Sequence, residues 1–138
     1  MLLDTCALIW LQNADPMRDE AIAAIFHAGT AGGVFVSPIS AWEIGLASQT
    51  RLNRPPRLAF APTPKAWFQR AMNAPGVSPA PFTPEIAIDS SYLPGNLQND
   101  PADRIIIATA RRLDVPIVTR DRRIIDYARD GHVSVIAC

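Results

Sequence analysis

Short apolar runs alternate with amphipathic stretches from one end of the chain to the other. Runs typical of buried strands lie at Met1–Asp4, Val34–Ser37, Val115–Thr119 and Val133–Ala137, and stretches with helical periodicity fall between them. Strands that alternate with helices predict an α/β domain with a small, mainly parallel sheet sandwiched by helices. A length of 138 residues fits a single domain over residues 1–138.

Helical periodicity and end signals set the expected helices. Asp100 stands at an N-cap, with Pro101 at the first helical position and Asp103 in the first turn. Ser40, with Glu43 three residues later, has the spacing of a capping box. We expect helices over Thr5–Gln12, Asp15–His27, Ser40–Gln49, Pro64–Asn73, Pro84–Leu93, Pro101–Leu113 and Arg122–Arg129.

The middle of the chain is rich in proline. Most of the thirteen prolines lie between Pro55 and Pro94, and proline ends helices and is excluded from central strands. We therefore expect an irregular loop over Arg51–Thr63 and a short edge strand over Val77–Phe82. Apolar residues continue through this region, which we interpret as an insert within one domain.

Composition excludes several classes of protein. Hydrophobic residues make up 49% and charged residues 19% of the chain, as in ordinary globular proteins, and no apolar run approaches the roughly 20 residues that span a bilayer. Asp4 follows Met1–Leu3 directly, so we expect no secretory signal. Thirteen basic residues balance thirteen acidic ones. Two cysteines at opposite ends form no disulfide framework, so we expect a cytoplasmic protein without a membrane segment.

Four carboxylates are expected at one edge of the sheet. Asp4 ends the first strand, Asp121 follows the strand at Val115–Thr119, and Glu43 and Asp103 lie in the first turns of helices. In an open parallel sheet, the carboxyl ends of the strands and the starts of the following helices share one edge, where ligands bind. Taken singly, each acid also fits a helix cap or a partner of the helix dipole. Taken together, they favour a metal site.

Helical periodicity predicts that two of these carboxylates lie on the packed sides of their helices. Asp103 shares a face with Ile106 and Ala110, and Glu43 shares a face with Ile39. Several partly buried carboxylates need a compensating cation, because an unpaired buried charge is costly. Hard divalent ions, Mg²⁺ or Mn²⁺ as its substitute, suit sites made of oxygen ligands.

An acidic metal pocket without a Gly-Lys phosphate loop suits phosphodiester hydrolysis. In such a site one or two ions orient a water in line with the phosphorus and neutralise the developing charge. Arg104, Arg120 and Arg122 flank the acids in sequence and are predicted to contact RNA phosphates. A solvated arginine face is the alternative.

Four motifs lie at Leu3–Trp10, Ser40–Ile44, Asp100–Ala108 and Val118–Asp121. In order and spacing they resemble the PIN-domain ribonucleases and, more narrowly, VapC-type toxins of type II toxin–antitoxin pairs. The resemblance covers nearly the whole chain. It implies a PIN-like fold and Mg²⁺- or Mn²⁺-dependent endoribonuclease activity, often on tRNA or rRNA.

The resemblance also implies roles for single residues. Asp4 and Asp103 match the family's usual metal ligands, and with Glu43 and Asp121 they match its acidic quartet. One branch of the family adds an acid at Asp100 and often has a histidine near the position held here by Gln98. The neighbouring hydroxyl residues, Thr5 and Thr119, are expected to support the site. Family members are usually homodimers, held inactive by a cognate VapB-type antitoxin whose tail can place an arginine in the acidic pocket.

Three other functions remain open at this point. The chain can be a catalytically idle PIN-fold module that binds RNA or protein. A phosphatase of the haloacid dehalogenase type also uses an Asp after its first strand, but it needs a second Asp where Cys6 stands. A thiol enzyme would pair Cys6 with His27 or His132, and neither histidine has a supporting pattern. Metal-dependent cleavage of RNA distinguishes the nuclease from all three.

Overall fold

The structure is a computed structural model that describes residues 1–50, 57–95, 97 and 100–138. Its strands are β1 (Leu2–Leu3), β2 (Val34–Val36), β3 (Val77–Pro79), β4 (Ile117–Thr119) and β5 (Val135–Ala137). Its helices are α1 (Thr5–Asn13), α2 (Asp19–Thr30), α3 (Pro38–Ala47), α4 (Pro64–Met72), α5 (Pro84–Ser91), α6 (Pro101–Leu113) and α7 (Arg122–Arg129). None of these helices is long and apolar enough to cross a membrane.

The strands form one sheet in the order β3-β2-β1-β4-β5, and every neighbouring pair is parallel. The predicted α/β class and parallel sheet are therefore confirmed. From β1 the chain builds outward through β2 to β3, and then returns to place β4 on the other side of β1. Leu3 is in register with both Val36 and Val118. The order reverses between β1 and β4, which is where open α/β sheets bind ligands.

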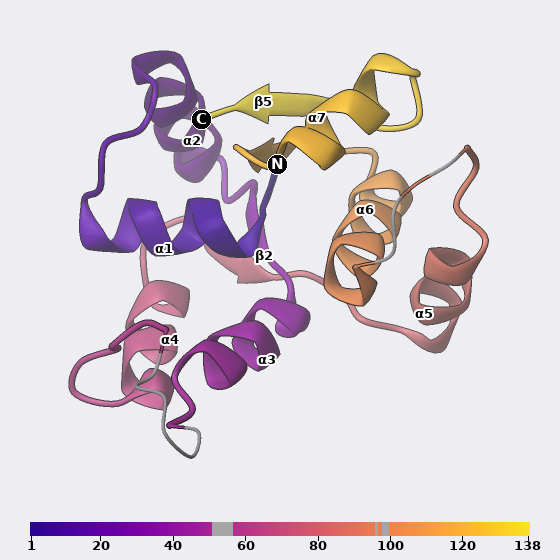
Figure 1. The fold of residues 1–138 in the computed structure, drawn as a ribbon. Helices are drawn as coiled ribbons and strands as arrows, with labels where there is room; N and C mark the ends of the chain where they lie inside the picture. Colours follow the sequence, from indigo (N-terminus) through magenta and orange to yellow (C-terminus); the bar gives the residue numbers. More distant parts are fainter. Residues whose placement is uncertain (51–56, 96, 98–99) are drawn as a thin grey trace.

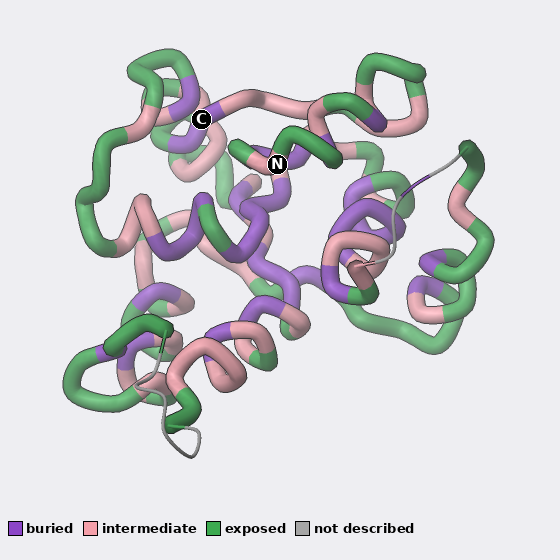
Figure 2. Tube along the Cα trace, viewed as in Figure 1, coloured by how far each residue is buried: buried purple, intermediate pink, exposed green. Residues whose placement is uncertain are grey.

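Helices cover both faces of the sheet (Figure 1). Because side chains alternate along a strand, Leu3 packs on one face with residues of α1, α2 and α4, while Leu2 packs on the other with α6 and α7. Both leucines are fully buried. Figure 2 shows the same arrangement, with burial concentrated on β1, β2 and β4 and on the inward sides of the helices, while the edge strands β3 and β5 are only partly buried. The two halves of the core fix the carboxyl end of β1 at the centre of the molecule.

Most expected elements are confirmed, including the edge strand of the proline-rich region, which forms β3. The loop expected over Arg51–Thr63 lies partly outside the described residues, and its remainder, 57–63, holds no helix or strand. Gln98 also lies outside the described residues.

The expected start of α2 at Asp15 was wrong. The backbone N–H of Asp15 instead donates to Trp10 O at 2.8 Å and closes the end of α1, with Ala14 in the left-handed region at φ 57°. This is the hydrogen-bond pattern of a helix C-terminus. The chain then runs to Arg18, the N-cap of α2.

The capping box expected at Ser40 was also wrong. The N-cap of α3 is Ser37, whose hydroxyl oxygen accepts from Ile39 N at 3.3 Å, and Pro38 takes the first helical position. Proline is favoured there because its missing N–H is not needed. Ser40 consequently lies inside the helix, fully buried, and is available for a contact within the site.

Candidate active site

Asp4 stands at the junction of β1 and α1 and is 4% exposed. One carboxylate oxygen accepts a hydrogen bond from the backbone N–H of Ala7 at 2.5 Å, which makes Asp4 the N-cap of α1. The other oxygen accepts from the hydroxyl of Thr119 at the end of β4. The acid is therefore a helix cap and a member of the site at once.

Glu43 reaches the same region from α3. The hydroxyl of Thr5 donates to a carboxylate oxygen of Glu43, and it also lies 2.9 Å from the hydroxyl oxygen of the buried Ser40. Since one hydroxyl carries one proton, Ser40 is left to donate to Thr5. Thr5 therefore holds Glu43 in place, as its expected supporting role requires. Sequence reasoning missed Ser40, although its position three residues before Glu43 places both on one face of the helix.

The remaining acids lie at the starts of α6 and α7. Asp100 caps α6 by accepting from Ala102 N at 2.9 Å, and Asp121 caps α7 by accepting from Arg123 N at 2.7 Å. The N–H of Asp121 donates to the hydroxyl oxygen of Thr119 at 2.9 Å. Thr119 thus links the carboxylate of Asp4 to the backbone of Asp121. Among the described residues, the half-buried side chain of Asp103 makes no hydrogen bond.

The acids influence one another's protonation. Burial raises the pKa of Asp4 to about 6, the hydrogen bonds from Thr119 and Ala7 oppose that rise, and the charges of Asp121 and Glu43 add to it. Burial likewise raises the pKa of Asp103 to about 7, and the other four acids raise it further. Among the described residues, no arginine or lysine lowers either pKa. The charges of Asp4, Glu43, Asp100 and Asp121 therefore all act on Asp103.

The donor set fits a hard divalent ion. Every donor is a carboxylate or hydroxyl oxygen, which Mg²⁺ and Mn²⁺ prefer, and the mutual repulsion is the kind that a cation relieves. Within the described residues no three acidic, histidine or cysteine side chains are grouped tightly enough to enclose an ion. Mg²⁺ does not need such a cage, because it usually keeps several waters and binds through one or two carboxylates.

Cys6 lies beside the acids on the first turn of α1. Desolvation, followed by the charges of Asp4 and Glu43, raises the pKa of its thiol to about 11. A nucleophilic cysteine needs the opposite, an electropositive setting that lowers its pKa. The thiol-enzyme alternative therefore has no support in this arrangement.

The three arginines predicted to contact phosphate have different surroundings. Arg104 donates from Nε to Ser90 O at 2.8 Å and connects α6 to the C-terminal end of α5. Arg120 donates from Nε to Cys138 O at 2.9 Å and from Nη2 to Pro16 O at 2.8 Å. Arg122 is exposed at the start of α7.

The guanidinium of Arg120 also lies 4.2 Å from the centre of the Trp10 ring. It therefore joins the end of α1, the segment after α1 and the end of β5. These contacts favour bracing the carboxyl edge of the sheet over reaching RNA, whereas the exposed Arg122 has no such bonds among the described residues.

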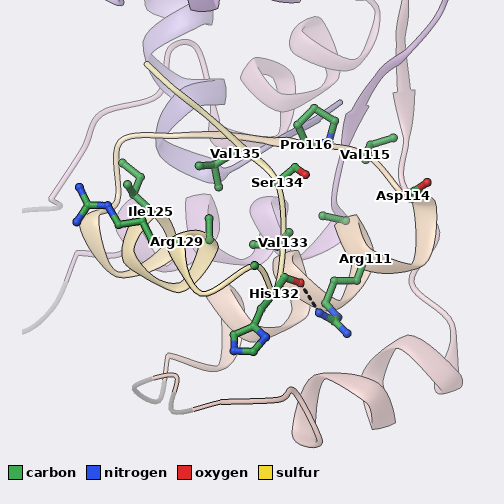
Figure 3. Close-up of a pocket in the computed structure, with 13 residues that line it drawn as sticks. Arg111, Asp114, Val115, Pro116, Ile125, Arg129, His132, Val133, Ser134 and Val135 are labelled. Carbon is green, nitrogen blue, oxygen red and sulfur yellow. Dashed lines mark hydrogen bonds between the residues drawn. The ribbon is translucent and has the colours of Figure 1, made fainter.

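A cavity of about 730 Å³ lies at the amino ends of β4 and β5 (Figure 3), whereas the acids lie near the carboxyl ends of the strands. It is lined by Pro116 and Ser134, which precede β4 and β5, and by Arg111, which donates to His132 O. The C-terminal ends of α6 and α7 border it, and their negative dipole ends oppose the binding of an anion. A second cavity of about 500 Å³ opens beside the acids, between α1 and α3.

The molecule has a parallel sheet, with acids on or at the starts of four helices near the carboxyl ends of its strands. This arrangement defines a class of α/β proteins whose ligand-binding edge is acidic. The chain belongs to the PIN-domain family, whose model matches residues 1–130. It is 33% identical to Ribonuclease VapC22 of Mycobacterium tuberculosis (strain ATCC 25618 / H37Rv) over 138 residues, which cover 98% of this chain and 97% of that protein.

Solved structures share the fold. One is VapBC2 from Rickettsia felis bound to a DNA fragment from their promoter, with a TM-score of 0.67 and 13% identity over 99% of this chain and 96% of that chain. Another is FitAcB from Neisseria gonorrhoeae, with a TM-score of 0.56 and 22% identity over 98% and 95% of the two chains. The predicted PIN-like fold and family resemblance are confirmed.

Proposed function

We propose that the protein is a divalent-metal-dependent endoribonuclease and the toxin of a type II toxin–antitoxin pair. The observation that carries the proposal is the shared field of Asp4, Glu43, Asp103 and Asp121 at the switch point of the sheet. The relationship to a ribonuclease of the VapC type supports it.

Asp4 and Asp103 would hold the ion, and Glu43, Asp121 and Asp100 would bind its waters or add a ligand. A bound Mg²⁺ or Mn²⁺ supplies Lewis-acid stabilisation of the phosphate and a water of lowered pKa. Thr119 keeps one oxygen of Asp4 fixed by its hydrogen bond, and Thr5 does the same for Glu43. Glu43, whose pKa is raised by burial, would accept a proton from the attacking water.

RNA contacts are proposed for the exposed Arg122 and for Arg104. The Nε of Arg104 already donates to Ser90, but its two terminal nitrogens remain as a rigid pair of donors for a phosphate. Phosphate contacts of this kind position the RNA without reading its sequence. A cut in tRNA or rRNA is the proposed outcome, following the resemblance.

The proposed partner is a VapB-type antitoxin. VapBC2, one of the solved structures that share the fold, is bound to a DNA fragment from their promoter, and the acids around Asp4 and Asp103 suit an arginine from a partner chain. A homodimer in the cytoplasm completes the proposal. Co-expression with the product of a neighbouring small gene, followed by purification in high salt, should give a stable complex with little ribonuclease activity.

The activity itself is tested with protein free of the antitoxin. We expect cleavage of a structured RNA with Mg²⁺ or Mn²⁺ and none with EDTA. Equal cleavage with and without the chelator would overturn the metal-dependent mechanism. A protein that binds RNA but never cleaves it would instead be the catalytically idle module.

A further inference from the structure

The cavity of about 500 Å³ continues from the acids into the groove between α1 and α3. One end is lined by Thr5, Glu43 and Asp100, which belong to the acidic site. The walls beyond them are apolar and come from Ile9 of α1 and Leu46 of α3. The groove therefore opens onto the side of the acidic site formed by Glu43 and Asp100.

Trp42 is the unusual residue of this groove. Its side chain is 53% exposed, although tryptophan is normally well buried, and it directly precedes Glu43 in α3. The core uses other residues of the same helix, Ser40 and Ile44, which are at most 1% exposed. Of the two other tryptophans, Trp67 is buried in the core and Trp10 is stacked by Arg120. An indole left open to solvent beside the acids has no packing role that explains it.

We propose that this groove binds an unpaired nucleobase of the RNA next to the bond that is cut, with Trp42 as its stacking platform. This inference rests on the proposed function. Every base has a π-face that stacks on an aromatic side chain, and RNA is commonly recognised through unstacked bases held in this way. A strand whose phosphate lies at the acids can continue into the groove, because Glu43 and Asp100 line one end of it.

The other groups of the groove suit a nucleotide. Ile9 and Leu46 line the same cavity as Trp42 and give it apolar walls, which suit the flat faces of a base. Arg57, which is exposed and lines the same cavity, supplies a cation for the phosphate that follows the base. An apolar peptide would use the walls, but it would leave Arg57 without a partner of opposite charge. The site therefore predicts a preference for single-stranded RNA over paired RNA.

The test is binding of a short, labelled single-stranded RNA by fluorescence anisotropy, with Ca²⁺ as the divalent ion and the integrity of the RNA checked on a gel. Trp42→Ala should weaken binding roughly 5- to 100-fold, and Trp42→Phe should retain most of the affinity. Phe26→Ala is the matched control, because Phe26 is also an exposed helical aromatic, at 69%, and does not line the groove. It should bind like the unmodified protein.

An abasic RNA isolates the contact. Removing the flanking base should weaken binding to the unmodified protein but make little further difference to Trp42→Ala, because the two changes remove the same interaction. Equal binding by Trp42→Ala and the unmodified protein would overturn the proposal, and so would a variant that binds RNA normally but loses its protein partner.

Binding and cleavage separate this inference from the proposed function. Trp42-dependent binding by a protein that never cleaves RNA would support the subsite and refute the nuclease. Normal metal-dependent cleavage and normal RNA binding by Trp42→Ala would support the nuclease and refute the subsite. Thermal melting of each variant shows that it is folded.

Discussion

The hydroxyl of Thr119 donates a hydrogen bond to the carboxylate of Asp4, joining the ends of the two central strands. Thr119 is fully buried and Asp4 nearly so. The same hydroxyl oxygen accepts from the backbone N–H of Asp121 at 2.9 Å. One threonine therefore sets the position of one acid of the site and ties it to the backbone of another.

Thr119→Val keeps the shape of the side chain and removes this hydrogen bond. We expect the free energy of unfolding to fall by about 1–3 kcal/mol, because a buried carboxylate loses a donor, and RNA cleavage to fall as well. Thr109→Val is the control, since Thr109 is equally buried but donates only to Ile105 O of its own helix. Urea unfolding and cleavage rates measure both effects. Equal loss of activity in the two variants would contradict the role of Thr119.

The raised pKa values of Asp4 and Asp103 predict how stability depends on pH. Both acids bind a proton more tightly in the folded protein, at about 6 and about 7, than their ordinary value of 3.8. Without divalent ions, these two acids should stabilise the folded state fully below about pH 4. Their contribution should fall as the pH rises from about 4 to about 7 and change little above that.

Asp103→Asn removes one of the two groups and should flatten this dependence. It should also leave the metal-free protein at least as stable at pH 8, because a repelled charge is gone. Melting temperatures at pH 5 and pH 8 in EDTA, for both proteins, measure the effect. A metal-free protein that grows more stable from pH 5 to pH 8 would show that burial and the neighbouring acids do not raise these two pKa values.

Arg120→Lys tests whether this arginine is a brace. Lysine keeps the charge but cannot make the two separate bonds to Cys138 and Pro16 while lying flat on Trp10. We expect a loss of stability of about 1 kcal/mol and an unchanged salt dependence of RNA binding. Arg122→Ala should do the reverse. It should leave stability unchanged and lower by about one the slope of the logarithm of the RNA-binding constant against the logarithm of the salt concentration. A lower salt dependence of RNA binding for Arg120→Lys would instead support the phosphate contact predicted for Arg120 from the sequence.

Gly76 is required by the close approach of two backbones. Its φ is +76°, and a Cβ added there would lie 2.0 Å from the carbonyl oxygen of Gly29. We expect Gly76→Ala to cost roughly 2 kcal/mol or more and to disturb β3. Gly131→Ala separates the two causes, because Gly131 has a similar φ of +82° with nothing within 4 Å. If both variants lose the same stability, the backbone conformation alone explains the effect.

The fold was largely predictable because its signals are local. The alternation of strands and helices predicted the parallel sheet, and the Asp100–Pro101 start predicted α6 correctly. The errors at Asp15 and Ser40 arose where a competing local bond decided the outcome. Asp15 closes α1 instead of opening α2, and Ser37 with Pro38 starts α3 earlier than Ser40 would.

The candidate site was predictable in its acids but not in its hydrogen bonds. Topology alone placed Asp4 and Asp121 at adjacent strand ends, because parallel strands share an edge. The bonds of Thr5 to Ser40 and of Arg120 to Cys138 join residues far apart in sequence. Helical periodicity carries no information about such pairs. The contact of Ser40 with Thr5 was therefore not predicted, and the role of Arg120 was inferred only from the acids near it in sequence.

The central claim is that Asp4 and Asp103 hold a divalent ion, and titration calorimetry with Mn²⁺ on the antitoxin-free protein tests it most directly. The unmodified protein should bind Mn²⁺, Asp100→Asn should bind it with at most a modest loss because Asn also caps a helix, and Asp103→Asn should not bind it. Full Mn²⁺ binding by Asp103→Asn, with loss in Asp100→Asn, would contradict the assignment of ligand and cap.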